Sequence, residues 1–382
     1  MEILFWGAIL ILTYIYLGYP LLLNILPKNK ISKTPLDFYP SITVIIPAFN
    51  EEDVIAETIQ NKLDQGYPAD KINIIVVSDE SEDATDEIVT TFQQKYKNVQ
   101  LIRQVPRKGK TSGLNLAYQV IKTELKSELI VFSDANSIYD KNVLTEIAQT
   151  FTDPEVGYVT GKMVYVNSDD SMVGDGCSAY MKYENYMRSL ESDIGSVVGV
   201  DGGVDAIRAE LYTELRADQL PDFVQPLKVV EQRKRVVYQP LAILKEESLT
   251  DDGAEFRMRV RVSLRALWAL FDMRMLLNPF KFGLFSLQLF SHKVLRYLAF
   301  IPLVIAFITN VVLLGQHAIF NLALFAQLAF YLSAWLGHKN TGQTNKWIGL
   351  AHYFCLINFA AAIASYKFIK GEKIVIWKPR QG

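Results

Sequence analysis

Residues 41–79 contain the pattern that decides the fold of this chain. They read SITVIIPAFN (41–50), EEDVIAETIQNKLDQ (51–65) and, after a short connection, NIIVVSD (73–79). The first and last segments are short, continuous apolar runs rich in β-branched residues, which is typical of buried strands. The middle segment has helical spacing and carries acidic residues in its first turn, where the helix dipole favours them. The stretch therefore predicts a strand–helix–strand unit of a parallel sheet.

The same alternation continues as far as residue 136. A helix is expected at DATDEIVTTFQQKY (83–96), a strand at VQLIRQ (99–104), a helix at TSGLNLAYQVIKTEL (111–125) and a strand at ELIVFSDAN (128–136). Ligands of such sheets bind beyond the carboxyl ends of the strands. The polar residues at those ends are therefore the first candidates for function: Asn50, Glu51, Asp79, Asp134 and Asn136.

Composition limits the class of protein. The chain has 382 residues, of which 50% are apolar, and its formal net charge is −2. That length exceeds what one core usually fills, so two or three structural units are expected. The charge balance gives no sign of a nucleic-acid-binding protein. Cys177 and Cys355 are too few for a disulfide framework or a cysteine-rich metal site, which fits a reducing compartment.

The N-terminal segment predicts a membrane anchor. Leu4–Leu26 is almost free of charge and long enough for the ~20 residues that a helix needs to cross a bilayer. A signal peptide would have a shorter apolar core and an A-x-A-like cleavage site, so an uncleaved anchor is favoured. Lys28, Lys30 and Lys33 follow at once, and by the positive-inside rule they place the next domain in the cytoplasm.

Three further apolar runs predict C-terminal spans at Leu295–Leu314, Ala318–Leu336 and Ile348–Tyr366. Buried helices of a soluble core are the alternative. A multi-pass protein of the cell membrane is therefore expected. The spans do not decide on which side of the membrane the C-terminal tail lies, because four spans would place this basic tail outside, against the positive-inside rule. The predicted organisation is a 1–27 anchor, a 38–270 globular domain, a 271–294 amphipathic interfacial segment, 295–366 transmembrane helices and a 367–382 basic tail.

Asp79 and Lys110 are candidates for contact with a nucleotide. Asp79 directly follows a predicted strand and could accept hydrogen bonds from a base or a ribose, although a helix cap is the alternative. Lys110 lies in RQVPRKGKTSGLN (103–115), a basic, glycine-containing loop that opens a helix. Such a loop suits phosphate or ribose contact, but many basic loops are simply solvated.

The triplet Asp134-Ala135-Asn136 is a candidate metal site. Alternate residues of an extended segment point the same way, so the two polar side chains can face one ion. Oxygen donors in small number suit Mg²⁺ or Mn²⁺, which keeps its other positions for diphosphate oxygens. Such an ion would stabilise a departing nucleoside diphosphate. An isolated D-x-N pattern is common and carries little weight alone.

Sugar transfer by direct displacement needs a base that takes the proton of the acceptor hydroxyl. Asp222, in QLPDFVQPLKVV (219–230), is the candidate, and a surface turn after Pro221 is the alternative.

An arginine run, EFRMRVRVSLRALW (255–268), follows further along the chain. As a helix it places Arg257 and Arg261 on one face, and Arg261 and Arg265 likewise. These side chains could clamp phosphates or meet lipid headgroups, and the spacing does not separate the two.

Together these segments resemble the family 2 glycosyltransferases with a GT-A fold, a group that includes cellulose, hyaluronan and chitin synthases and many exopolysaccharide enzymes. The resemblance covers nearly the whole chain and is carried, in order and spacing, by VIIPAFNEE, VVSDESEDAT, RKGKTSGLN and VFSDAN. It implies an α/β domain with a Rossmann-like, mostly parallel sheet.

The resemblance also implies residue roles. Asp134 and Asn136 would hold the divalent ion, Mg²⁺ or Mn²⁺. LPDFVQPLKVV resembles the segment with the general base, which maps to Asp222, and EFRMR lies where processive members carry Q-x-x-R-W. The donor-binding set implied is Pro47, Ala48, Asn50, Glu51, Asp79, Lys110, Asp134 and Arg259.

Three departures from the family pattern matter. The metal motif is D-A-N, which would alter metal affinity. Only Asp222 follows Pro221, where many relatives have two acids before the phenylalanine. Phe256 and Val260 replace the Gln and Trp of Q-x-x-R-W, a motif associated with long polymers, so processive synthesis is in doubt.

The resemblance implies an inverting transferase that moves a sugar from a nucleotide-sugar, expected to be a UDP-sugar, to a lipid-linked or membrane-associated glycan. The expected product has a β-linkage. The expected partners are membrane lipids and polysaccharide-export proteins, and no nucleic acid is expected among them. One alternative is a processive synthase that secretes its polymer through its own helices. Another is a catalytically silent membrane scaffold. A transporter is disfavoured, because the predicted spans are few and have no charged residues at their centres.

Overall fold

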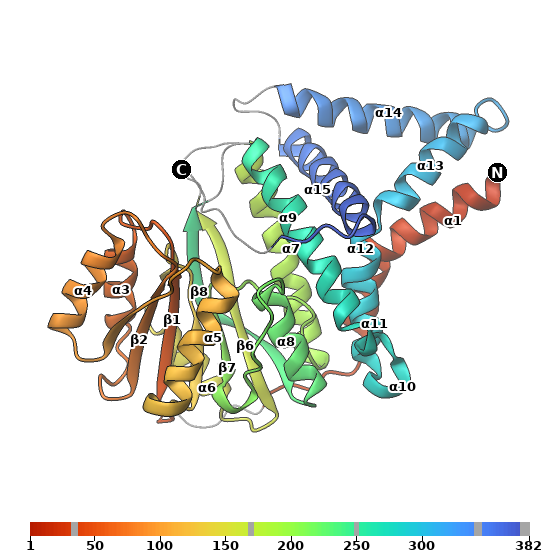
Figure 1. Ribbon diagram of the computed structural model, residues 1–382. Helices are drawn as coiled ribbons and strands as arrows, with labels where there is room; N and C mark the ends of the chain where they lie inside the picture. The colour runs from red at the N-terminus through yellow and green to blue at the C-terminus, as the bar shows by residue number, and fades with distance from the viewer. Residues whose placement is uncertain (32–36, 167–171, 248–251, 340–345, 375–382) are drawn as a thin grey trace. The chain divides into compact units, whose positions relative to one another are not determined.

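The computed structural model describes residues 1–31, 37–166, 172–247, 252–339 and 346–374 (Figure 1). Lys33 and the end of the predicted basic tail lie outside these ranges. The chain divides into two compact units. The helical unit comprises Met1–Pro27, Tyr165–Leu190 and Glu247–Lys373, and the sheet unit comprises Lys28–Val164 and Glu191–Glu246. Parts of the predicted 38–270 domain thus belong to the helical unit.

The sheet unit contains an eight-stranded mixed sheet in the order β3-β2-β1-β4-β7-β6-β8-β5. Its first four strands along the chain run parallel: β1 (Ile42–Ala48), β2 (Ile72–Ser78), β3 (Val99–Arg103) and β4 (Leu129–Phe132). The later strands are β5 (Ile138–Tyr139), β6 (Val156–Val166), β7 (Asp205–Arg208) and β8 (Arg235–Glu247). β7 is antiparallel to β4 and β6, and β5 is antiparallel to β8. The predicted α/β fold with a mostly parallel sheet is confirmed.

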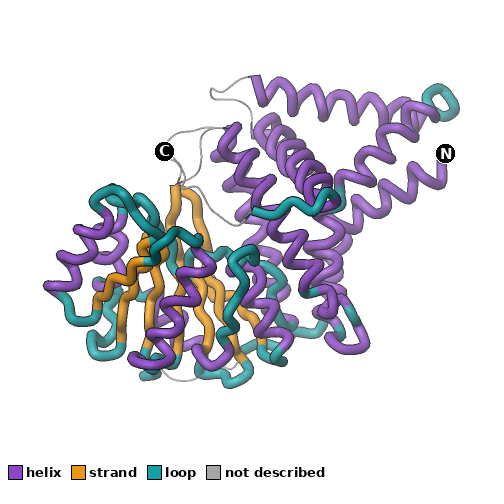
Figure 2. The backbone as a smooth tube through the Cα atoms, in the orientation of Figure 1, coloured by secondary structure: helices purple, strands orange, loops and turns teal. Residues whose placement is uncertain are grey.

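Helices connect the parallel strands, as the sequence pattern predicts (Figure 2). They are α3 (Ile55–Leu63), α4 (Thr85–Lys95) and α5 (Lys110–Val120) with the π-helical turn η2 (Ile121–Leu125). Helix α6 (Val143–Thr150) lies between β5 and β6. The 3₁₀ turn η3 (Ala209–Leu211) and α8 (Pro221–Glu231) follow. Strand β1 is buried on both faces, which explains its continuous apolar run.

Among the described residues of the helical unit, three helices are long and apolar enough to cross a membrane. α1 (Glu2–Thr13), the π-helix η1 (Tyr14–Gly18) and α2 (Tyr19–Ile25) together form one of them, and α14 (Ala318–Lys339) and α15 (Lys346–Ile369) are the others. Only 17% of the apolar 18-residue stretch of α14 is buried, and side chains such as Phe325 are exposed. A soluble core would cover these apolar faces, so the alternative of buried soluble helices is not supported.

The first predicted C-terminal span, Leu295–Leu314, is not one straight helix. Two segments, Leu284–Tyr297 and Phe300–Val312, are bent by 56° at the break between them. Pro302 explains the position of the break, because a proline ring clashes with the carbonyl four residues earlier, here that of Leu298. The first segment consists of α11 (Leu284–Leu289), η5 (Phe290–Val294) and α12 (Leu295–Tyr297), and the second contains α13 (Phe300–Val312).

Four further elements complete the described part of the helical unit. α7 (Met172–Ile194) begins in this unit, and α9 (Asp252–Asp272) contains the arginine run that was predicted to be helical. The predicted interfacial segment begins with the short turns η4 (Arg274–Leu277) and α10 (Pro279–Phe282).

Candidate functional site

The candidate site lies at the carboxyl edge of the parallel strands. Pro47 and Ala48 are the last two residues of β1 and pair with Val77 and Ser78 of β2. Asp79 directly follows β2, and β4, on the other side of β1, ends just before the D-A-N triplet. This is the edge at which open α/β sheets bind ligands, as the sequence predicted.

Asn50 and Glu51 join the loop after β1 to the loop after β2. The Asn50 backbone N–H donates to Ser81 Oγ at 3.2 Å, and Asn50 Oδ1 accepts from the Glu82 N–H at 2.9 Å. The Glu51 N–H donates to Thr85 Oγ1 at 2.8 Å. Asn50 has φ 52°, a left-handed conformation that asparagine tolerates better than most residues. Their contact with a donor stays a prediction.

Asp79 anchors the loop that precedes α5. Its Oδ1 accepts hydrogen bonds from Gln104 Nε2 at 2.5 Å and from the Lys108 N–H at 2.9 Å. The Gly109 N–H lies 3.0 Å from Oδ2, and the Arg107 guanidinium pairs with the same oxygen at 3.2 Å. The sequence did not predict that Asp79 anchors this loop, because the spacing between residue 79 and residues 104–109 does not indicate that they are in contact.

The helix-cap alternative for Asp79 is wrong. Helix α4 begins at Thr85, and it is Asp83 that accepts from the Thr85 N–H, at 3.0 Å.

Lys110 brings two distant carboxylates together. It is the first residue of α5, and its Nζ lies 2.8 Å from Asp134 Oδ1 and 3.2 Å from Asp222 Oδ1. Burial alone would lower the pKa of Lys110, but the two carboxylates outweigh burial and raise it. The ammonium is therefore charged at physiological pH. Three residues singled out from the sequence thus form one cluster.

Asp222 lies in the first turn of α8 after Pro221, not in a surface turn. It packs directly against Gly202, whose φ is 90°. A Cβ atom on Gly202 would lie 2.7 Å from Asp222 Cγ, which is too close for any side chain. On neighbouring Gly203, a Cβ atom would lie 3.6 Å from Asp134 Oδ2. The Gly202–Gly203 turn therefore backs both carboxylates.

Asp205 holds this turn from the side of the core. Its carboxyl is fully buried, and Oδ2 accepts from the Gly202 N–H at 3.0 Å and from the Tyr158 hydroxyl at 2.9 Å. Burial, assisted by the charges of Asp201 and Asp222, raises the pKa of Asp205 to about 7. Sequence analysis missed this support, although two adjacent glycines before a strand were a signal of a tight turn.

The residues at this edge fit a divalent cation that is shared with a substrate. Asp134 and Asn136 are both partly exposed and offer oxygen donors, and a cationic group, the Lys110 ammonium, already lies 2.8 Å from Asp134. Among the described residues, no group of three or more His, Cys, Asp or Glu side chains could hold a metal unaided. Phosphate or water oxygens would have to complete the coordination, which is typical of Mg²⁺.

Residues 43–199 match the family model described as "Glycosyl transferase family 2". This chain carries a family 2 glycosyltransferase domain. The motifs that suggested this family from the sequence lie within the matched region, and the enzyme class expected from them is confirmed.

Curated relatives of this chain include a beta-monoglucosyldiacylglycerol synthase of Trichormus variabilis, 22% identical over 55% of this chain and 45% of the relative. They also include a poly-beta-1,6-N-acetyl-D-glucosamine synthase of Staphylococcus aureus, 25% identical over 61% of this chain and 56% of the relative. The chain spans from about a fifth to just over half of the length of the curated relatives it matches.

A solved structure shares the fold. The mannosyltransferase PcManGT from Pyrobaculum calidifontis, in complex with GDP-Man and Mn²⁺, matches with a TM-score of 0.70 over 97% of this chain and 99% of that one. The two sequences are 20% identical, so the match establishes the GT-A fold of this chain and no more.

Arg259 lies in α9 of the helical unit, so its predicted contact with diphosphate stays a prediction. Within that unit its Nε pairs with Glu255 Oε1 at 2.7 Å, and its Nη2 donates to the Tyr353 hydroxyl at 2.6 Å. The guanidinium also lies 5.2 Å from the centre of the Tyr180 ring. The side chain is thus held in a fixed direction, which suits a binding arginine.

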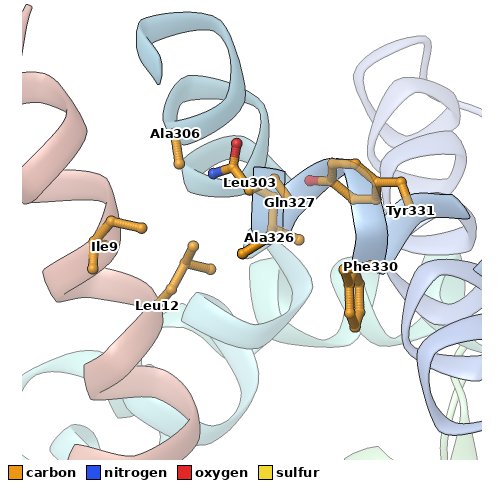
Figure 3. A pocket seen from close by; sticks show the side chains of 8 residues that line it. All are labelled: Ile9, Leu12, Leu303, Ala306, Ala326, Gln327, Phe330 and Tyr331. Carbon is orange, nitrogen blue, oxygen red and sulfur yellow. The ribbon is translucent and has the colours of Figure 1, made fainter. Parts of the chain in front are cut away.

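A groove of about 290 Å³ lies among α1, α13 and α14 of the helical unit (Figure 3). Most of its lining is apolar, and Gln327 and Tyr331 contribute polar groups. Its chemistry matches hydrocarbon, as expected between helices that meet lipid. The residues that line it are Ile9, Leu12, Leu303, Ala306, Ala326, Gln327, Phe330 and Tyr331.

Proposed function

We propose that this glycosyltransferase moves a sugar from a nucleotide-sugar donor, expected to be a UDP-sugar, to a lipid-linked or membrane-associated glycan with inversion of configuration. The observation that carries the proposal is the cluster of Asp134, Lys110 and Asp222 at the carboxyl edge of the sheet. It combines a candidate metal ligand, a cation and a candidate base within a few ångströms, which is the set that sugar transfer from a diphosphate requires.

Each residue of the cluster has a distinct part in this reaction. The Asp222 carboxylate takes the proton of the acceptor hydroxyl while the oxygen of that hydroxyl bonds to the anomeric carbon of the donor sugar. The bond from the anomeric carbon to the diphosphate oxygen breaks in the same step. Lys110 keeps Asp222 ionised, because its ammonium lies 3.2 Å from the carboxylate. Asp134 and Asn136 would hold a divalent cation, which supplies charge stabilisation to the departing diphosphate.

The acceptor class and the location of the domain rest on the helical unit and on the relatives. Three helices suited to a membrane fit an acceptor at the bilayer, and one relative is a glucosyldiacylglycerol synthase. Lys28 and Lys30 favour a cytoplasmic domain. Lys28 also pairs with Asp193 at 3.0 Å, so part of its role is structural.

A processive polysaccharide synthase is the second candidate function. The relative that makes poly-beta-1,6-N-acetyl-D-glucosamine aligns with 61% of this chain and favours it. Phe256 and Val260, at the positions of Gln and Trp in the processive motif, argue against it. The length of the glycan product separates the two functions.

Release of nucleoside diphosphate tests the proposal. Membranes with the full-length protein would be incubated with UDP-, GDP- and dTDP-sugars, and UDP-sugars should be consumed. Asp134→Ala should abolish the release, because the cation would lose its charged ligand in the triplet. EDTA should also abolish it, and Mn²⁺ or Mg²⁺ should restore it. Full activity in the presence of chelator would refute metal dependence. If none of the nucleotide-sugars yields nucleoside diphosphate, the result would favour the catalytically silent scaffold.

A further inference from the structure

The segment that carries the metal motif has two faces. Asp134, Asn136 and Ile138 are partly exposed, whereas the intervening Ala135, Ser137 and Tyr139 are buried. The segment is not extended at the motif itself, because the Ser137 N–H donates to the Asp134 carbonyl at 3.2 Å and closes a turn over Asp134–Ser137. The partly exposed side chains nevertheless include both candidate metal ligands, and the buried positions between them are available for anchoring.

Helix α3 binds the backbone of all three buried positions. Thr58 Oγ1 donates to the Ala135 carbonyl at 2.5 Å, and Lys62 Nζ donates to the Ser137 carbonyl at 2.5 Å. The side chain of Asn61 makes a two-way contact with Tyr139: its Nδ2 donates to the carbonyl, and its Oδ1 accepts from the backbone N–H, both at 2.9 Å. Residues 58, 61 and 62 share one helix face, so a single helix fixes the segment at every second residue.

Lys62 is the least expected of these anchors. Its side chain is fully buried, and among the described residues its ammonium forms no ion pair with a carboxylate. The Nζ instead lies 3.6 Å from the centre of the Tyr139 ring and donates to Asn61 Oδ1 at 3.1 Å. Burial lowers the pKa of Lys62, and the charge of Asp134 opposes that effect. Burying an apolar side chain at this position would cost less free energy than burying an ammonium group. We therefore attribute the presence of a lysine here to the hydrogen bonds that its Nζ donates.

The anchoring extends to the turn behind Asp222. The Tyr139 hydroxyl lies 2.9 Å from the Gly203 carbonyl and 3.1 Å from the Phe132 carbonyl. The ring that receives the Lys62 ammonium is thus also bonded to the Gly202–Gly203 turn. Helix α3 consequently supports both parts of the candidate site from behind.

We propose that Thr58, Asn61 and Lys62 are positioning residues, with Lys62 the principal one, that hold the D-A-N segment so that Asp134 and Asn136 present their oxygens to one cation. The inference rests on the proposed metal-dependent transfer. Ligands on a short loop bind a cation well only when they are held to within ~0.5 Å, and groups behind the ligands supply that rigidity. Either protonation state of Lys62 can donate to the Ser137 carbonyl.

Metal affinity tests the proposal with a readout other than activity. Mn²⁺ binding to the purified full-length protein in detergent, with UDP present, would be measured by electron paramagnetic resonance. Lys62→Met keeps the length and removes the donor, and it should weaken Mn²⁺ binding by about 10- to 100-fold, the usual effect of losing a group behind a metal ligand. Excess Mn²⁺ should restore transfer in Lys62→Met but not in Asp134→Ala.

Ile59→Val is the matched control. Ile59 is buried on the same helix but has no polar group, so this variant should shift the melting temperature without changing Mn²⁺ affinity. Thr58→Val removes only the hydrogen bond to the Ala135 carbonyl and should also weaken Mn²⁺ binding. If Lys62→Met does not fold, the Mn²⁺ affinity of Thr58→Val decides whether α3 positions the metal ligands. Wild-type Mn²⁺ affinity in the folded variants would overturn the inference and leave the proposed function intact. Failure of the wild type to bind Mn²⁺ would overturn both.

Discussion

At the scale of single residues, Asp222 has its direction set by two neighbours from other parts of the chain. The Lys110 ammonium lies 3.2 Å away, and Gly202 leaves room for the carboxyl group, because a Cβ atom on it would lie 2.7 Å from Asp222 Cγ. The cation keeps the carboxylate ionised, and the glycine leaves the space that the carboxylate occupies. A proton acceptor needs both its charge and its position, and here they come from different residues.

Replacing Asp222 by Asn should abolish transfer and preserve donor binding. The amide keeps the shape of the side chain but cannot take a proton, and loss of a general base typically costs ~10²–10⁴ in rate. Transfer would be followed by product formation, and donor affinity by UDP titration calorimetry. Transfer at near the wild-type rate would place the base elsewhere, with Asp201 the next residue to test.

Arg259→Ala provides the contrast. If Arg259 touches the diphosphate, as the resemblance implies, this variant should weaken UDP binding by about 1.5–3 kcal/mol, the value of a charge-assisted hydrogen bond. Unchanged UDP affinity would assign Arg259 a purely structural role with Glu255 and Tyr353.

Gly202→Ala should impair transfer more than donor binding. The added Cβ would lie 2.7 Å from Asp222 Cγ, and the φ of 90° strains any other residue, so the base must move. Gly195→Ala serves as a control, because a Cβ there meets nothing within 4 Å. The measurement is the ratio of the transfer rates at saturating donor, and equal rates for the two variants would contradict the role given to Gly202.

At the scale of elements, β7 connects the candidate site to the core through Asp205. The strand lies between β4 and β6, and its first residue binds both the Gly202 N–H and the Tyr158 hydroxyl. A pKa of about 7 in the folded state, against an ordinary 3.8, means that the protonated carboxyl stabilises the fold. That stabilisation is complete below the unfolded pKa and is lost as pH rises through about 7.

Asp205→Asn should therefore remove a pH dependence of stability. The amide cannot ionise, so the melting temperature of the wild type relative to this variant should fall as pH rises from about 5 to about 7.5. Thermal unfolding in detergent at several pH values measures the difference, and Asp64→Asn, a position whose backbone caps α3, controls for general charge effects. A constant difference would show that Asp205 does not titrate in this range.

At the scale of the whole molecule, the candidate spans predict two alternative topologies for the chain. The sheet unit should be cytoplasmic by the positive-inside rule. The bent pair ending at Val312 crosses the membrane if it is a broken span, and it returns to the same side if it is re-entrant. These arrangements place the connection before α14 on opposite sides.

Cysteine accessibility distinguishes them. In a chain with both native cysteines replaced by serine, Gln94→Cys on α4 should be labelled only after permeabilisation of the cells. Gln316→Cys, in the connection before α14, should be labelled from outside if the bent pair is one span. Lys370→Cys would give the side of the tail in the same way. Labelling of Gln94→Cys in intact cells would reverse the predicted orientation.

The sequence by itself determined the elements and the edge at which they present polar groups. Apolar β-branched runs separated by amphipathic helices have few other ways to bury their surface, so β1 to β4 and their connecting helices could be predicted from residues 41–136. The strand-end residues Asp79, Asp134 and Asn136 followed from that pattern, because parallel strands end at one edge. The span at Leu295–Leu314 was predicted from apolar length alone, which gave no sign of the 56° bend that the structure places just before Phe300.

Only the tertiary structure decided which residues support one another. Lys110 lies 112 residues from Asp222 along the chain, and Asp205 binds the hydroxyl of Tyr158, 47 residues away. Lys62 acts through the backbone carbonyl of Ser137 in another segment. A backbone carbonyl or N–H looks the same in every sequence, so the bonds from α3 to the D-A-N segment leave no motif. They arise because folding places a buried helix face beside the segment from Asp134 to Tyr139, whose inward backbone groups need partners.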